Sequence, residues 1–260
     1  MSQVTNMIRT RRDDSRGALI GYLPVGFPDV ATSIDAAEAL VRGGVDIIEF
    51  GLPYSDPGMD GSVIQAATVE ALKNGVKVSD AFTAIEELTK RVDVPVVIMT
   101  YWNLVMSQGV EYFAERLKNA GGAGLITPDL IPDEAAEWIS VSDEFELDRI
   151  FLAAPTSTEQ RLERISELSR GFVYTVSTMG VTGARTDVDN AARELVGRLR
   201  DVGCENSCVG LGISSGAQVR EVLEYADGAI VGSALVKALA EGGVTRVQQV
   251  AEELATGKLR

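Results

Sequence analysis

The sequence predicts an α/β fold of the (β/α)₈ TIM-barrel type, and three observations lead to it. Short apolar runs alternate with amphipathic stretches along all 260 residues, a pattern typical of parallel strands joined by helical crossovers. The apolar runs are continuous, which indicates strands buried on both faces. The length is close to the roughly 250 residues of an ordinary barrel. We expect a single domain over residues 1–260, because no linker or shift in composition divides the chain.

Eight strands are expected, most of them rich in Val, Ile or Leu: residues 18–23, 45–51, 96–100, 124–126, 149–153, 172–176, 208–212 and 228–231. The first helix, 30–42, follows Asp29 as its cap and ends at a pair of glycines. Similar helical stretches cover 78–92, 110–120, 133–142, 158–170, 188–200 and 217–225, and extra helices are expected at 3–13, 62–73 and 245–254. A doubly wound open sheet is the structural alternative, but no GxGxxG fingerprint follows the first strand.

The charge balance limits the partners. There are 24 basic and 38 acidic residues, a net charge of −14, which argues against nucleic acids and anionic membranes because both are held by clustered Lys and Arg. A small phosphate ligand stays possible, since it needs only a local positive spot. No apolar run approaches the roughly 18 residues of a membrane span, and the N-terminus lacks the apolar centre of a signal peptide. We therefore expect a cytoplasmic protein whose Cys204 and Cys208 are reduced.

The residue types present also limit the chemistry. The chain has no histidine, which excludes Ser-His-Asp machinery and most zinc sites, so no metal is expected. Every lysine falls in a predicted helix, the turn after it or the C-terminal tail. Schiff-base and pyridoxal-phosphate lysines at a strand end are therefore not expected. Proton transfers in an enzyme of this composition must use carboxylates, Tyr, Lys or water.

Two carboxylates are candidates for that role. Glu49 shares a strand face with Ile47 and Gly51 near the end of the second predicted strand, where barrel enzymes place catalytic groups. Partial desolvation there would raise its pKa and suit it to general acid/base work. The alternative is an acid that ends a strand and pairs with a neighbour. Asp60 is the last acid before the next helix, and capping that helix is its alternative role.

Glycine-rich turns indicate a phosphate site. They are residues 210–216 after the seventh strand and 231–234 after the eighth, the places where barrels commonly bind phosphate through backbone N–H groups at a helix N-terminus. The loop 177–183 after the sixth strand adds further glycines, which would also permit a lid to close. The alternative is that these glycines only end elements.

Taken together, several segments resemble the alpha subunit of tryptophan synthase: residues 21–29, 49–57 with 60–61 and 64–65, 128–130, 154–158, 174 with 180–183, 210–214 and 227–234. The resemblance implies retro-aldol cleavage of indole-3-glycerol phosphate to indole and glyceraldehyde 3-phosphate by a carbon–oxygen lyase. It implies a beta-subunit partner, in an α₂β₂ complex, that uses pyridoxal phosphate to join indole to serine, and no cofactor in this chain. The chemistry fits the exclusions above, because an indole ring protonated at C3 is its own electron sink.

The resemblance also assigns roles to individual positions. It places the catalytic pair at Glu49 and Asp60. It places substrate-binding residues at Tyr22, Tyr174, Thr182 and Leu211, phosphate-binding residues at Gly183, Gly212, Gly232 and Ser233, and a partner-coupling loop at Pro53, Asp56 and Pro57.

The chain departs from the family pattern at Tyr22, Met59, Ser62, Leu104 and Leu211, which affects loop closure and the shape of the indole pocket. Two alternatives are another phosphate-binding barrel enzyme and a subunit without activity of its own. The first could be a pentose-phosphate isomerase or an indole-glycerol-phosphate synthase, and the latter would need a lysine near a strand end. A subunit that only activates its partner would not need both Glu49 and Asp60.

Overall fold

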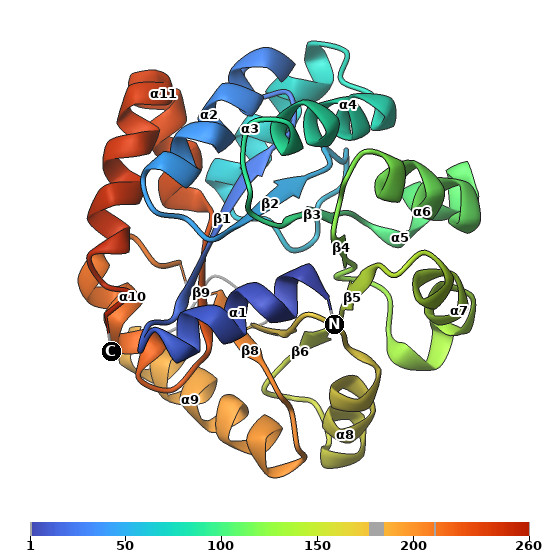
Figure 1. Cartoon of the computed structure of the whole chain (residues 1–260), viewed down its shortest axis with the longest axis vertical. Helices are drawn as coiled ribbons and strands as arrows, with labels where there is room; N and C mark the ends of the chain where they lie inside the picture. The colour runs from blue at the N-terminus through green and yellow to red at the C-terminus, as the bar shows by residue number, and fades with distance from the viewer. Residues whose placement is uncertain (1, 177–184, 211, 260) are drawn as a thin grey trace.

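The computed structural model describes residues 2–176, 185–210 and 212–259, without the side chains of 185–189. Its strands form one parallel sheet in the order β5-β4-β3-β2-β1-β9-β8-β7-β6 (Figure 1). They are β1 (Ala18–Pro24), β2 (Ile47–Gly51), β3 (Val96–Met99), β4 (Gly124–Ile126), β5 (Asp148–Ile150), β6 (Leu152–Ala153), β7 (Val173–Val176), β8 (Ser207–Gly210) and β9 (Gly228–Val231). The two edge strands, β5 and β6, are halves of one segment, so the sheet closes on itself. The predicted (β/α)₈ barrel is confirmed.

The helices surround the sheet (Figure 1). They are α1 (Gln3–Asp13), α2 (Val30–Arg42), α3 (Ser62–Lys73), α4 (Val78–Thr89), α5 (Trp102–Gln108), α6 (Val110–Asn119), the 3₁₀ turn η1 (Pro132–Glu134), α7 (Ala136–Glu144), α8 (Glu159–Leu168), α9 (Arg185–Asp201), α10 (Gly216–Leu223) and α11 (Ser233–Ala255). The sequence analysis missed α5. The predicted helix 245–254 is the C-terminal part of α11. In the structure α11 begins at Ser233 and has a kink at Gly243.

Several predicted boundaries were wrong for local reasons. The fifth predicted strand is divided at Phe151 into β5 and β6. The seventh ends at Gly210, and Gly212 has a positive φ of 61° that does not continue a strand. The second begins at Ile47, because the N–H of Val45 still donates to the carbonyl of Leu40 at the end of α2.

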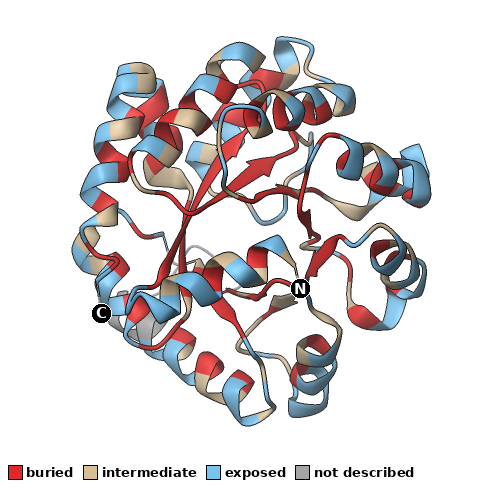
Figure 2. Cartoon of the chain, viewed as in Figure 1, coloured by how far each residue is buried: buried red, intermediate tan, exposed pale blue. Residues whose placement is uncertain are grey.

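The interior of the barrel is filled by alternate residues of the strands. Ile20, Ile47, Ile126 and Ile230 belong to one buried cluster, and Figure 2 shows the strands as the most continuously buried part of the chain. Helix α1 crosses the N-terminal end of the barrel (Figure 1), where its Val4 and Ile8 join the same cluster. Helix α1 therefore closes the strand core at its N-terminal end.

Ion pairs fasten the chain termini to that closed end. Asp46, almost fully buried, accepts hydrogen bonds from Arg11 Nε at 2.6 Å and Lys258 Nζ at 2.7 Å. Its second oxygen accepts from the N–H of Leu19 at 2.8 Å. The buried charge is thus paired and hydrogen-bonded, as such charges must be. Nowhere in the described part of the chain does a helix have the length and apolar character to cross a membrane.

Candidate active site

Three predicted site residues enter the barrel interior near its C-terminal end. Side chains alternate along a strand, so Tyr22 follows interior Ile20 and Glu49 follows interior Ile47. Tyr22 and Glu49 are also register partners on the neighbouring strands β1 and β2. Tyr174 follows interior Phe172 in the same way and packs against the interior cluster. The alternation of side chains along the strands therefore places these three groups in one layer of the barrel interior.

Glu49 is the most strongly perturbed carboxyl group at this end. Its side chain is 1% exposed, and its Oε2 has no hydrogen-bond partner among the described residues. Burial, and secondly the negative charge of Asp60, raise the pKa of Glu49 to about 8. A carboxyl group of this kind is mainly protonated at neutral pH, so it is able to give a proton to a substrate.

Asp60 lies in the loop between β2 and α3 and is half-buried. Burial raises the pKa of Asp60 to about 6, which leaves it mainly ionised at neutral pH. The negative charge of Asp60 also contributes to the raised pKa of Glu49, so the two carboxyl groups lie within electrostatic reach of each other. At neutral pH the site therefore holds one protonated and one ionised carboxyl group. Pairs of carboxyl groups whose pKa values differ in this way can take different roles, one as a proton donor and one as an anion.

The two tyrosines lie within the field of these carboxyl groups. Burial, and to a smaller extent the charges of Asp60 and Glu49, raise the pKa of Tyr22 well above its usual value. Burial, and to a smaller extent the charges of Glu49 and Asp60, also raise the pKa of Tyr174. Gly51 leaves room for one ring: a Cβ there would lie 2.2 Å from the Tyr22 hydroxyl. The structure therefore brings Tyr22, Glu49, Asp60 and Tyr174 together.

Two of the predicted phosphate-binding positions, Gly232 and Ser233, form the N-terminus of α11. No side chain caps this helix, so its first N–H groups are available to an anion. A Cβ at Gly232 would lie 3.3 Å from Tyr22 Cδ1 and 3.4 Å from Ile64 Cδ1, which places the glycine beside the tyrosine ring. Gly212 follows the adjacent strand β8, and its Cβ would meet no described atom within 4 Å.

The remaining predicted residues divide into two groups. Thr182, Gly183 and Leu211 lie outside the described residues. Pro53, Asp56 and Pro57 lie in the loop that leads from β2 to Asp60, where Pro53 is buried and Asp56 is exposed. The coupling loop and Asp60 therefore belong to one continuous stretch of chain.

Three residues that contact the site were given no role from the sequence, although two of them, at 64 and 65, lie in a segment of the family resemblance. Ile64 packs toward Gly232, Gln65 Nε2 donates to the carbonyl of Asp60 at 2.8 Å, and Tyr101 Oη accepts from the N–H of Met59 at 3.0 Å. Tyr101 comes directly after the third predicted strand, and that position was the available signal. Among the described residues no group of three or more Cys, Asp or Glu side chains is placed to hold a metal ion.

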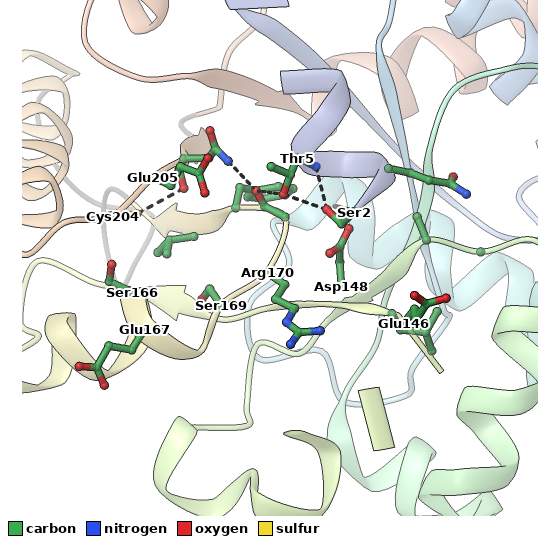
Figure 3. A pocket seen from close by; sticks show the side chains of 18 of the residues that line it. Ser2, Thr5, Glu146, Asp148, Ser166, Glu167, Ser169, Arg170, Cys204 and Glu205 are labelled. Carbon is green, nitrogen blue, oxygen red and sulfur yellow. Dashed lines mark hydrogen bonds between the residues drawn. The ribbon is translucent and has the colours of Figure 1, made fainter. Parts of the chain in front are cut away.

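A large pocket of about 690 Å³ lies at the opposite end, where β5, β7 and β8 begin (Figure 3). Its lining includes Asp148, whose carboxylate oxygens are buried and form no hydrogen bond of ordinary length. Burial raises the pKa of Asp148 to about 6, against smaller lowering effects of the Ser2 hydroxyl and the Val4 amide. Asp148 lies against Ser2 and Val4 at the first turn of α1, the helix that covers this end of the barrel. The C-terminal mouth is the stronger candidate.

Comparisons with known proteins show the family of the chain. A family model described as tryptophan synthase alpha chain matches residues 8–259. The tryptophan synthase alpha chain of Leifsonia xyli subsp. xyli is 64% identical over 260 residues, covering 100% of both chains. That of Mycobacterium intracellulare is 57% identical, covering 95% of this chain and 90% of its own.

Solved structures give the same result. A structure of Mycobacterium tuberculosis tryptophan synthase has a TM-score of 0.94 and 53% identity, covering 100% of this chain and 99% of its own. A tryptophan synthase complex from Pyrococcus furiosus has a TM-score of 0.83 and 34% identity, covering 92% and 98%. The similarity thus extends over the barrel and both of its ends.

Proposed function

Because this chain belongs to the tryptophan synthase alpha chain family, we infer that it cleaves indole-3-glycerol phosphate to indole and glyceraldehyde 3-phosphate in tryptophan biosynthesis. The enzyme is a lyase, and its reaction is a retro-aldol cleavage. The observation that carries the assignment of residues is the pair of carboxyl groups at the barrel mouth, with pKa values of about 8 for Glu49 and about 6 for Asp60.

We propose that Glu49 handles both protons of the reaction. The protonated carboxyl group first gives its proton to C3 of the indole ring, which leaves a positive charge on the ring. The resulting carboxylate then takes the proton of the glycerol hydroxyl next to C3. The C–O bond becomes a carbonyl, the C–C bond breaks, and its electron pair returns to the ring. Glu49 ends protonated, and the protonated ring itself accepts the electrons, so neither a metal nor a lysine Schiff base is needed.

Asp60 would stabilise the charged ring. Its ionised carboxylate would accept a hydrogen bond from the indole N–H, which becomes a stronger donor as positive charge builds on that nitrogen. An interaction that strengthens in the transition state raises the rate and not only the binding. The lower pKa of Asp60 keeps this group ionised at a pH where Glu49 holds its proton.

The phosphate group would lie at the N-terminus of α11, against Gly232 and Ser233, with Gly212 on the neighbouring strand's loop. Backbone N–H groups and the helix dipole attract a dianion without a lysine or arginine. A Cβ at Gly232 would contact the Tyr22 ring, so the proposed phosphate position lies beside this ring. This supports a pocket in which the phosphate group and the indole ring of the substrate lie on opposite sides of Tyr22. Tyr174, Thr182, Gly183 and Leu211 complete the proposed substrate pocket.

Glu49→Gln tests this assignment. Gln has nearly the same shape and carries no transferable proton, so indole release from indole-3-glycerol phosphate should fall by about 10²–10⁴, while glycerol 3-phosphate still binds. Glu115→Gln is the control, because Glu115 is exposed on α6. If the Glu49 variant kept more than about a tenth of the wild-type rate, well above the range for a lost acid or base, the role would be wrong.

Family membership implies a beta-subunit partner, and pyridoxal phosphate belongs to that subunit. We propose that the complex is an α₂β₂ tetramer, that this chain itself binds no cofactor, and that the loop with Pro53, Asp56 and Pro57 couples the two subunits. A cytoplasmic location is part of the same proposal. The free thiols of Cys204 and Cys208 support it, since thiols persist in reducing compartments.

A further inference from the structure

The backbone on both sides of Asp60 is held by side chains from two other elements. On one side, the N–H of Met59 donates to the hydroxyl of Tyr101 at 3.0 Å. On the other, Gln65 Nε2 of α3 donates to the carbonyl of Asp60 at 2.8 Å. These two hydrogen bonds bracket the residue whose carboxylate is proposed to face the indole N–H.

Packing does little to hold residues 58–61. A Cβ placed at Gly58 or at Gly61 would meet no described atom within 4 Å, and Met59 is 40% exposed. Glycines in open space allow the backbone many conformations. The position of Asp60 therefore depends on the two hydrogen bonds more than on contacts with neighbouring side chains.

Tyr101, in contrast, is well fixed. Its ring stacks on that of Tyr54, with 4.8 Å between centroids and 29° between planes, and Tyr54 Oη accepts from Asn103 Nδ2 at 2.9 Å. The next N–H, that of Trp102 at the start of α5, donates to the Asp129 carboxylate at 2.9 Å. The Tyr101 hydroxyl is thus anchored by the segments that follow β2, β3 and β4.

We propose that Tyr101 is a positioning residue for the cleavage reaction. Its hydrogen bond to the N–H of Met59 holds Asp60 where the carboxylate meets the indole N–H. The inference rests on the role of Asp60 in the proposed function, and it adds a residue of the third strand's loop to the catalytic apparatus. Tyr101 acts through the backbone, so it affects the step in which the ring becomes charged.

Tyr101→Phe tests the proposal, because it removes the hydroxyl and keeps the ring that stacks on Tyr54. We expect kcat for indole release to fall about three- to tenfold, the range for one hydrogen bond of ordinary strength. The affinity for glycerol 3-phosphate, which has no indole ring, should stay at the wild-type value. Tyr112→Phe is the matched control: Tyr112 is 47% exposed on α6 and accepts a local hydrogen bond from Arg116.

A second background separates positioning from general structural support. With Asp60→Asn in place there is no carboxylate to position, so adding Tyr101→Phe should change kcat by less than about twofold, as in a coupled double-mutant cycle. The proposal is overturned if Tyr101→Phe keeps the wild-type kcat, if glycerol 3-phosphate affinity falls with it, or if its full effect persists in the Asp60→Asn background. If Asp60→Asn alone keeps the wild-type kcat, the role of Asp60 in the proposed function is refuted, and the role of Tyr101 that rests on it is refuted too.

Discussion

Glu49→Gln should stabilise the fold while it removes the activity, and the gain should grow with pH. The pKa of Glu49 is raised from 4.5 to about 8 in the folded protein, so the folded state binds this proton more tightly than the unfolded chain. Ionisation of Glu49 therefore lowers the free energy of unfolding as the pH rises from about 4.5 to about 8. Gln has no such ionisation, so the variant escapes this loss.

The size of the effect follows from the pKa difference. Each pH unit of difference corresponds to about 1.4 kcal/mol, which gives an upper limit of about 5 kcal/mol for the ionised carboxylate. The buried amide of Gln also loses contact with water, at a cost of about 1–3 kcal/mol. We therefore expect the variant to be more stable than the wild type by roughly 2–4 kcal/mol at pH 8.5. At pH 5 the ionisation of Glu49 costs the wild type only about 1 kcal/mol, so the variant should be no more stable there, or slightly less stable.

Urea unfolding followed by circular dichroism at pH 5 and pH 8.5 measures this. The informative quantity is the difference between variant and wild type at each pH, because other groups titrate equally in both. Glu115→Gln, with an exposed side chain on α6, should give a difference that does not change with pH. A Glu49→Gln protein that is no more stable than the wild type at pH 8.5 would refute the burial argument and the acid role built on it.

Three further predictions concern the mouth of the barrel. The kcat/KM of the wild-type chain should be bell-shaped in pH, with limbs near 6 and 8, because the ionised carboxylate and the protonated one are both required; a profile with a single limb would contradict the paired roles. Gly232→Asp should abolish glycerol 3-phosphate binding in a calorimetric titration, because its carboxylate repels the dianion at the α11 N-terminus; unchanged affinity would move the phosphate site. Asp56→Ala should leave indole release by the isolated chain nearly intact and weaken its activation by the beta subunit; equal fold-activation in both proteins would remove Asp56 from the coupling route.

The barrel and the position of Glu49 inside it could be predicted because both depend on local periodicity. Continuous apolar runs indicate strands buried on both faces, and the two-residue alternation places Glu49 on the same face as Ile47. Helix α5 was missed because it is short and its start is fixed by Asp129, a contact between segments that no local pattern contains. The roles of Tyr101 and Gln65 were missed for the same reason, since each acts through a backbone group of another element.

The absence of basic side chains from the proposed phosphate positions has a chemical consequence for Glu49. A lysine or arginine close to the phosphate would also act on the carboxyl groups, and a nearby positive charge lowers the pKa of an acid. Here burial and Asp60 both raise the pKa of Glu49. The α11 N-terminus supplies only partial charges, which fall off within the first turn of the helix. A phosphate site made of glycines and N–H groups is therefore compatible with an acid that keeps its proton at neutral pH, whereas a site made of cations would weaken that acid.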